Sequence, residues 1–88
     1  MANSYTLTSD WTTANRFDVT GDRDVLVSNT CAFDIRWART SGPDTPATAP
    51  AMSHLLRPGQ SMSLSLRSGQ AIWLAALPGG TALVEDFG

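Results

Sequence analysis

Apolar and hydroxyl side chains alternate strictly over residues 61–66, Ser-Met-Ser-Leu-Ser-Leu. Successive side chains of a β-strand point to opposite faces of a sheet, so one face of this segment is predicted to be dry and the other wet. An Arg-x-Gly-Gln tetrapeptide flanks the segment on both sides, at residues 57–60 and 67–70. Because Pro presets φ for the first central position of a turn and Gly supplies the positive φ of the second, Pro58-Gly59 predicts a type II turn. The pattern indicates antiparallel strands joined by tight turns.

The same reading predicts further short strands. Residues 33–39 form the clearest amphipathic segment, and residues 25–28, which include the β-branched Val25 and Val27, form another strand. Residues 5–8 alternate weakly and belong either to a first strand or to an N-terminal arm of residues 1–15. Four more segments complete the series, at residues 16–20, 52–56, 70–77 and 81–87. No segment has the 3.6-residue period of a helix longer than two turns. About seven to eight strands at roughly ten-residue spacing predict an all-β fold, a small antiparallel sandwich or barrel.

The predicted core consists of the large apolar side chains within these strands. They are Val25, Val27, Phe33, Ile35, Trp37, Met62, Leu64, Leu66 and Trp73. Residues 40–50 contain three prolines and no large apolar side chain, so they are predicted to form a surface loop. Structureless loops of this length are often functional.

A chain of 88 residues is predicted to be a single domain, residues 1–88, with a core of marginal size. Cys31 stands alone, so no intramolecular disulfide can form, and Cys31 and His54 are too few for a structural zinc site. Homo-oligomeric assembly is therefore the expected source of additional stability. The net charge is −2, and the six basic residues, all Arg, form no basic stripe, which argues against a nucleic-acid partner. The N-terminus has no signal-peptide pattern, and the apolar run of residues 71–77 is too short to span a bilayer, so no membrane partner is expected.

Groups that could carry catalysis are few. His54 and Cys31 could form a nucleophilic pair oriented by Asp34 or Asp44, but nothing in their spacing favours this. The preferred interpretations are a small buried Cys and a partly buried core or interface His. Asp22-Arg23-Asp24 could supply oxygen ligands to a cation, although turn chemistry explains these carboxylates more simply. We therefore predict no catalytic residue, no metal, no cofactor and no small-molecule substrate.

Aromatic and Arg side chains dominate the energetics of protein interfaces. The predicted interface residues are Tyr5, Trp11, Phe17, Arg36, Arg39 and Phe87. Trp11 lies in a turn-rich segment and, with Tyr5 and Phe17, either anchors a neighbouring subunit or covers the domain's own core. A third interpretation is a sugar-binding platform of exposed aromatic rings.

Several segments, in order, resemble the small β proteins that tailed bacteriophages carry as virion accessory proteins, such as head-decoration and head-fibre-base proteins. A strand ending in Asn29 is followed by Ile35-Arg36-Trp37-Ala38, a Pro-rich loop, residues 54–60 ending in Pro-Gly-Gln, and residues 69–74 and 80–84. The resemblance covers about residues 24–85. It implies a jelly-roll-like fold without catalytic residues, located in the virion, which binds the capsid as a homo-oligomer, with a trimer favoured. Where the family often has an acidic residue after Pro-Gly, this chain has Gln60.

The leading hypothesis is therefore a non-enzymatic virion structural protein that decorates and stabilises a phage capsid by binding the major capsid protein or other virion proteins. A tail or adaptor component is the nearest alternative. A glycan- or receptor-binding module would use Trp11, Trp37 or the 40–50 loop. A cupin-like enzyme would need His54 with carboxylates and a metal, and a regulator would act on a host protein through an exposed strand edge.

Overall fold

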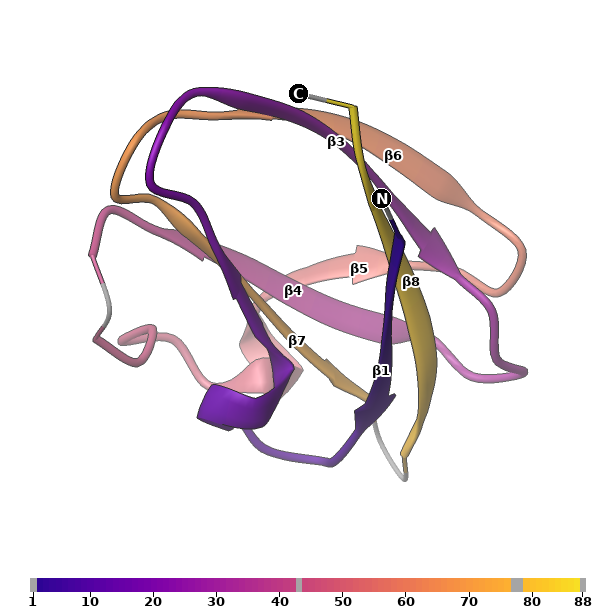
Figure 1. Ribbon diagram of the computed structural model, residues 1–88. Helices are drawn as coiled ribbons and strands as arrows, with labels where there is room; N and C mark the ends of the chain where they lie inside the picture. The colour runs from indigo at the N-terminus through magenta and orange to yellow at the C-terminus, as the bar shows by residue number, and fades with distance from the viewer. Residues whose placement is uncertain (1, 43, 77–78, 88) are drawn as a thin grey trace.

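The computed structural model describes residues 2–42, 44–76 and 79–87. Over these ranges the chain forms eight strands in two four-stranded sheets that pack face to face (Figure 1). The strands are β1 (Ala2–Leu7), β2 (Arg16–Asp18), β3 (Arg23–Asn29), β4 (Ile35–Thr40), β5 (His54–Leu56), β6 (Ser61–Leu66), β7 (Ala71–Ala76) and β8 (Gly80–Asp86). Two single 3-10 turns, η1 (Thr13–Asn15) and η2 (Pro50–Met52), precede β2 and β5. The predicted all-β sandwich is confirmed.

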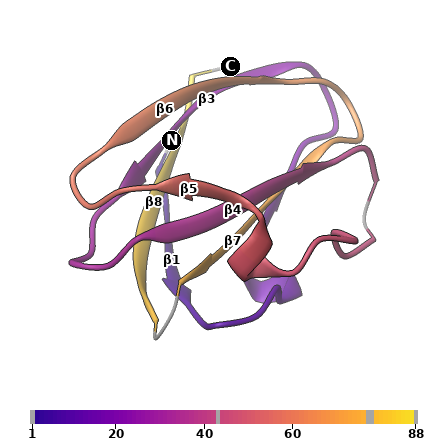
Figure 2. The same cartoon turned by 180° about the vertical axis from the view of Figure 1, so that it is seen from behind.

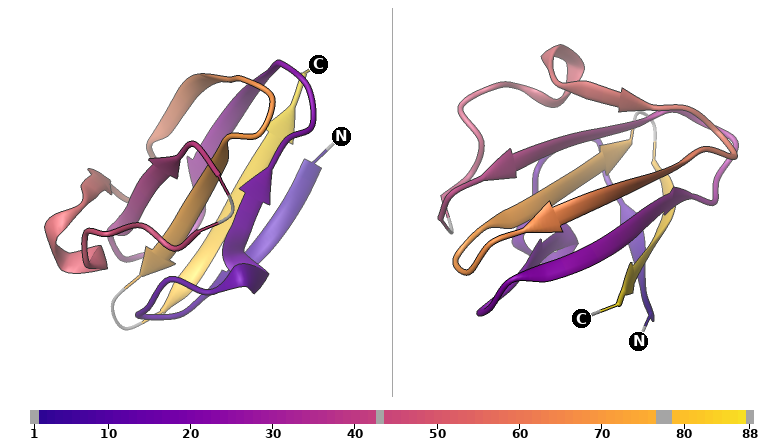
Figure 3. Two further views of the ribbon diagram at one scale, coloured as in Figure 1. Left: turned by 90° about the vertical axis from the view of Figure 1, so that its left-hand side faces the viewer. Right: turned by 90° about the horizontal axis from the view of Figure 1, so that it is seen from above.

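The strand order is that of a jelly roll. The first sheet has the order β1-β8-β3-β6 and the second β2-β7-β4-β5, and all neighbours are antiparallel. The first strand thus pairs with the eighth, the second with the seventh, the third with the sixth and the fourth with the fifth. This is the pairing of one long hairpin rolled over into two Greek keys. Apart from β4 and β5, consecutive strands lie in different sheets, so most connections cross between the two layers (Figures 2 and 3).

The first segment of the chain is a sheet strand and not an arm. All six residues of β1 pair with β8, from Ala2 opposite Glu85 to Leu7 opposite Gly80. Leu7 is buried in the core. The weak alternation at residues 5–8 therefore marks a real strand, and the alternative of an N-terminal arm over residues 1–15 is wrong for residues 2–7.

The core between the sheets contains most of the predicted residues. Val25, Val27, Ile35 and Leu66 are buried within it. Trp37, Met62 and Leu64 are partly buried and pack against it. Among the buried side chains that were not predicted are Leu7, Phe17, Val19, Leu56, Ile72, Leu74, Ala82 and Val84. The serines of β6 are exposed, so the predicted inside–outside register of this strand is confirmed.

Phe33 is the one predicted core residue that is exposed to solvent. Its exposed fraction is 48%, because it precedes β4 and belongs to the connection between β3 and β4. Side chains in this connection do not alternate between the faces of a sheet. The alternation begins at Ile35, the first residue of β4. The prediction extended a true strand two residues too far.

Trp73 is buried as predicted, but on the outer side of the second sheet. It pairs with Arg16 on one side and Ala38 on the other, and it does not belong to the core cluster, which contains its β7 neighbours Ile72 and Leu74. The Arg16 guanidinium carbon lies 5.4 Å from the centre of the indole ring. The indole N–H donates to Thr40 Oγ1 at 3.1 Å. All six β7 side chains are buried, so connecting segments cover the outer face of this strand.

The repeated tetrapeptide forms the same closed turn at both ends of β6. Gly59 and Gly69 have φ values of 79° and 86°, a region that favours glycine. In residues 57–60 the Gln N–H donates to the Arg carbonyl at 3.0 Å, and in residues 67–70 at 2.9 Å. In return the Gln side-chain oxygen accepts the Arg N–H, at 2.9 and 2.8 Å. The predicted turn geometry is confirmed, and the Gln side chain explains why the repeat extends beyond Gly.

Candidate functional site

The candidate catalytic residues do not form a site. Cys31 lies in the connection after β3 and is partly buried, whereas His54 is exposed at the start of β5. Within the ranges 2–42, 44–76 and 79–87, no group of three or more His, Cys, Asp or Glu side chains is placed to hold a metal ion. The cupin-like alternative therefore gains no support from the residues that the structure describes.

Cys31 takes part in a structural hydrogen-bond cluster around the buried Asn29. The Asn29 amide nitrogen donates to the carbonyl of Phe33 at 2.8 Å and to that of Leu56 at 2.9 Å. Its side-chain oxygen accepts the Cys31 N–H at 3.0 Å and the thiol at 3.1 Å. The Asn29 backbone also exchanges two hydrogen bonds with the turn at residues 57–60. The side chain and backbone of Asn29 together join β3, β5 and two connections, so this residue serves to hold the fold.

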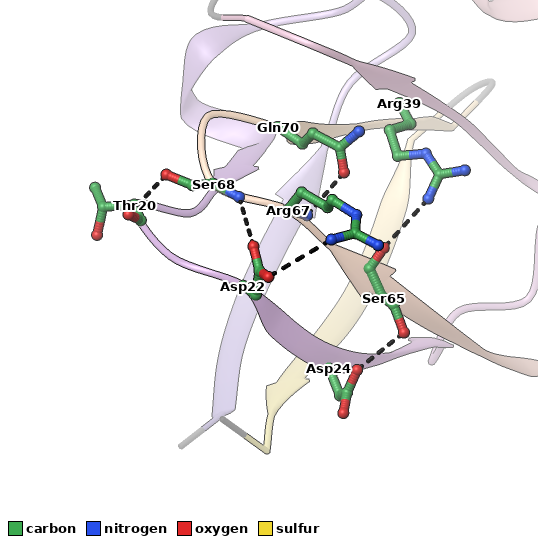
Figure 4. A network of polar contacts seen from close by, with 8 residues as sticks. All are labelled: Thr20, Asp22, Asp24, Arg39, Ser65, Arg67, Ser68 and Gln70. Carbon is green, nitrogen blue, oxygen red and sulfur yellow. Dashed lines mark hydrogen bonds and ion pairs between the residues drawn. The ribbon is translucent and has the colours of Figure 1, made fainter.

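The acidic segment Asp22-Arg23-Asp24 takes part in a polar network that fixes a turn (Figure 4). Asp22 accepts the Ser68 N–H at 3.2 Å and lies 3.8 Å from the Arg67 guanidinium, and Asp24 accepts the Ser65 hydroxyl at 2.9 Å. The ion pair is largely exposed, so it contributes little to stability by itself. The network ties the β6–β7 turn to the chain before β3, which favours turn chemistry over a cation site.

The outer face of the first sheet carries a broad array of hydroxyl groups, here called the hydroxyl face. Pleating and register place on it the three serines of β6, Ser28 of β3 and Thr81 of β8. Ser28 and Ser61 hydroxyls lie 2.9 Å apart, as do those of Thr30 and Thr81. Leu26 and Leu83 lie half-buried among them. The face therefore combines hydroxyl groups with the carboxylates of Asp24 and Glu85 and with limited apolar surface, a composition that suits contact with another protein.

The sandwich is less well covered on the side where β5 and β6 form the sheet edges. The Trp37 and His54 rings stack there, with centroids 4.6 Å apart and planes inclined by 29°. Trp37 is half-buried and His54 is exposed. Met62 and Leu64 of β6, the facing edge strand, are only half-buried. This side leaves apolar surface in contact with solvent.

A hollow of about 360 Å³ lies next to this side, between β4 and the loop that leads to β5. Its lining includes Arg39, Thr48, Ser53 and His54. It is open, and its volume is near the lower end of the range for ligand sites, roughly 300–1,000 Å³. The Trp11 indole N–H donates to the Thr48 carbonyl at 2.8 Å and so fixes one wall of the hollow. The predicted 40–50 loop therefore takes part in a cavity, although Pro43 lies outside the described residues.

The predicted interface residues fall into three groups. Phe87 and Arg39 are exposed, Phe87 by 66%, and remain available for contact. Tyr5, Trp11 and Arg36 are half-buried. Burial raises the pKa of the Tyr5 phenol above 10.0, and the charge of Asp18 adds to the rise. Phe17 is a wrong prediction, because β2 inserts its ring into the core and leaves only 8% exposed.

Comparisons with known proteins identify no relative: no family model, curated protein or solved structure matches the chain. Among the described residues, no helix is long and apolar enough to cross a bilayer.

Proposed function

We propose that this chain is a non-enzymatic virion structural protein of a tailed phage, which binds and stabilises the capsid through multiple copies. The observation that carries the proposal is the jelly-roll strand order together with a hydroxyl face on the first sheet. Jelly rolls are common in viral capsid and lectin domains and in cupins. Since one fold hosts many functions, the choice among these depends on surfaces and side chains.

The described surfaces favour binding over chemistry. The candidate nucleophile Cys31 is engaged with Asn29, and the candidate base His54 is stacked on Trp37. The hydroxyl face offers many weak polar contacts on a rigid sheet. A protein that binds an assembled shell and not its free subunits stabilises the shell by mass action, and repeated copies multiply the effect. A small binding module of this kind needs a stably folded scaffold and a face that is complementary to the surface of its partner.

The test is the protein content of purified particles. Virions of the phage that encodes this chain should contain it in many copies, in a fixed ratio to the major capsid protein. Particles that lack it should lose their genomes at lower temperature, and added protein should restore stability. A particle-bound variant series on the hydroxyl face, with Thr81→Lys compared with Thr81→Ala, would locate the contact. Absence of the chain from washed particles would contradict the proposal.

A second candidate function is glycan or receptor binding at the hollow beside β4. Arg39, Thr48 and Ser53 supply donors and acceptors there, and a His54–Trp37 ring stack lies next to them. Binding to a glycan array that is abolished by Arg39→Ala and by His54→Ala, but kept by Arg57→Ala at an exposed turn, would favour this function. The two proposals separate cleanly, since decoration does not require a sugar.

A further inference from the structure

The four edge strands of the sandwich differ in how well they are protected against pairing. The edges of the second sheet, β2 and β5, are three residues long, and β2 carries Arg16 and Asp18. The edges of the first sheet, β1 and β6, are six residues long and contain no charged residue, Pro or Gly. Short length, charge and Pro are the usual means by which proteins keep an edge from binding another strand. The first sheet lacks all of them on both sides.

Of these two long edges, β6 borders the less covered side of the molecule. Met62 and Leu64 point inward from it and remain half-exposed. Near the β1 edge, Leu7, Phe17 and Val19 are buried. A strand added beside β6 would therefore cover apolar surface that the single chain leaves in water, which favours association.

The backbone hydrogen-bonding groups of β6 that point away from β3 belong to its serines, and among them the Ser65 carbonyl accepts from Arg39. Asn29 N–H donates to the carbonyl of Gln60, the residue before β6, at 2.9 Å. Because antiparallel strands bond through alternate residues, Met62 and Leu64 continue this ladder to β3, while Ser61, Ser63 and Ser65 direct their N–H and C=O groups outward. Two contacts agree with this assignment. The Arg39 guanidinium donates to the Ser65 carbonyl at 3.4 Å, so this carbonyl points away from β3. The Phe87 N–H donates to the backbone carbonyl of Asp24, so the even-numbered residues of β3 bond to β8.

We propose that a second copy of this chain pairs with it through β6, antiparallel and about a two-fold axis at Ser63. This joins the two first sheets into one eight-stranded sheet. Ser63 then faces its own symmetry mate in a hydrogen-bonded pair, Ser61 faces Ser65, and Met62 faces Leu64. The pairing goes beyond the proposed function because it names the contact between copies. Only the role of the paired copies on a virus particle rests on the proposed function.

The sequence of β6 excludes a register shifted by one residue, and the axis at Ser63 pairs all three of its serines. A shift by one residue would set each serine opposite an apolar side chain and turn the hydroxyl face of one copy toward the core side of the other. With the axis at Ser63, hydroxyl faces continue across the junction and the half-exposed Met62 and Leu64 meet each other. A two-fold contact of this kind uses the same surface on both copies. It gives a dimer, in place of the trimer that the resemblance implies.

The first test measures the mass of the purified chain by sedimentation over a concentration series, without any particle. The expected result is a reversible monomer–dimer equilibrium. Ser63→Pro should shift the chain to monomer, because it removes the outward N–H without removing a bond to β3. Ser63→Ala keeps that N–H and should remain dimeric. A wild-type chain that stays monomeric up to its solubility limit, or a Ser63→Pro chain that is folded and still dimeric, would overturn the proposal.

A disulfide test fixes the register and does not depend on how well Ser63→Pro folds. In a Cys31→Ser background, Ser63→Cys should cross-link to itself on mild oxidation, because hydrogen-bonded opposite residues have Cα atoms about 5.5 Å apart, within the range for a disulfide. Ser61→Cys alone and Ser65→Cys alone should not cross-link, whereas their equimolar mixture should. Self-cross-linking of Ser61→Cys, or none with Ser63→Cys, would refute the register. Neither result would change the copy number measured in virions, so failure of the pairing and failure of the proposed function remain distinguishable.

Discussion

Asn29→Asp is the most informative single substitution in this fold, because it changes one atom at the centre of the Asn29 cluster. The Asn29 amide nitrogen donates to the carbonyls of Phe33 and Leu56 at 2.8 and 2.9 Å, and only 4% of the residue is exposed. The substitution puts an oxygen in place of that nitrogen, so the ionised side chain donates neither hydrogen bond and the protonated one can donate only one. At ~1 kcal/mol net for each bond, the protonated form loses about 1 kcal/mol and the ionised form about 2 kcal/mol or more of unfolding free energy.

The introduced carboxyl also titrates. Burial and two facing carbonyl oxygens raise its pKa above the ordinary ~3.9, since both disfavour the charged form. At neutral pH each unit of this rise costs ~1.4 kcal/mol relative to the protonated form. The folded-state pKa lies above the unfolded one, so stability is kept at low pH and lost as pH rises through the folded-state value. The expected loss relative to wild type is about 1–2 kcal/mol at pH 4, where the folded-state carboxyl is protonated, and above about 2 kcal/mol at pH 7.

Urea unfolding followed by tryptophan fluorescence measures both losses. Asn29→Leu is the matched control, because it removes the same donors, has similar volume and does not titrate. It should lose about the same free energy relative to wild type at both pH values. A loss below about 1 kcal/mol for Asn29→Asp at pH 7, or an equal loss at pH 4 and pH 7, would refute the role assigned to Asn29.

Three further predictions test other parts of the fold. Gly59→Ala and Gly69→Ala should each lower the unfolding free energy by about 1–2 kcal/mol, because both positions have left-handed φ; Gly21→Ala, where an added Cβ meets nothing within 4 Å, should be nearly neutral in the same urea series. Leu66→Ala should cost about 2–5 kcal/mol by opening a cavity in the core, whereas Ser63→Ala on the exposed face should change thermal stability very little. Because the pKa of Tyr5 is raised by burial, folding stability should be full below pH ~10 and fall as pH rises from the unfolded value through the folded one. Tyr5→Phe should remove that part of the decline in an alkaline unfolding series, and an unchanged decline would contradict the assignment.

The strands and turns of this chain are predictable where local chemistry is sufficient. Alternation in residues 61–66 gave the correct faces of β6, and the Arg-x-Gly-Gln repeat marked two equivalent turns. Alternation alone does not say where a strand begins, so it predicts a core position for Phe33, which lies before β4. Alternation also does not say which connecting segments pack against the outer face of a sheet. Trp73 is buried on the outer side, where the η1 turn before β2 packs on β7 and the Arg16 guanidinium lies over the indole ring, a tertiary feature without a local signal.

The surfaces are harder to predict than the elements. The hydroxyl face requires the register of β3, β6 and β8, which brings Ser28 opposite Ser61 and Thr81 next to Thr30. The prediction of interface residues chose aromatic side chains by type, yet Phe17 and Tyr5 point into the molecule because pleating and register set their direction. Residue type indicates what a side chain contributes to an interface, and topology decides whether it can reach one.

The most direct test of the central claim, that this jelly roll works as a repeated binding module of a virion, is to count its copies in purified particles. Quantitative mass spectrometry of salt-washed virions should find many copies in a constant ratio to the major capsid protein. A chain that is made during infection but is absent from those particles would contradict the account.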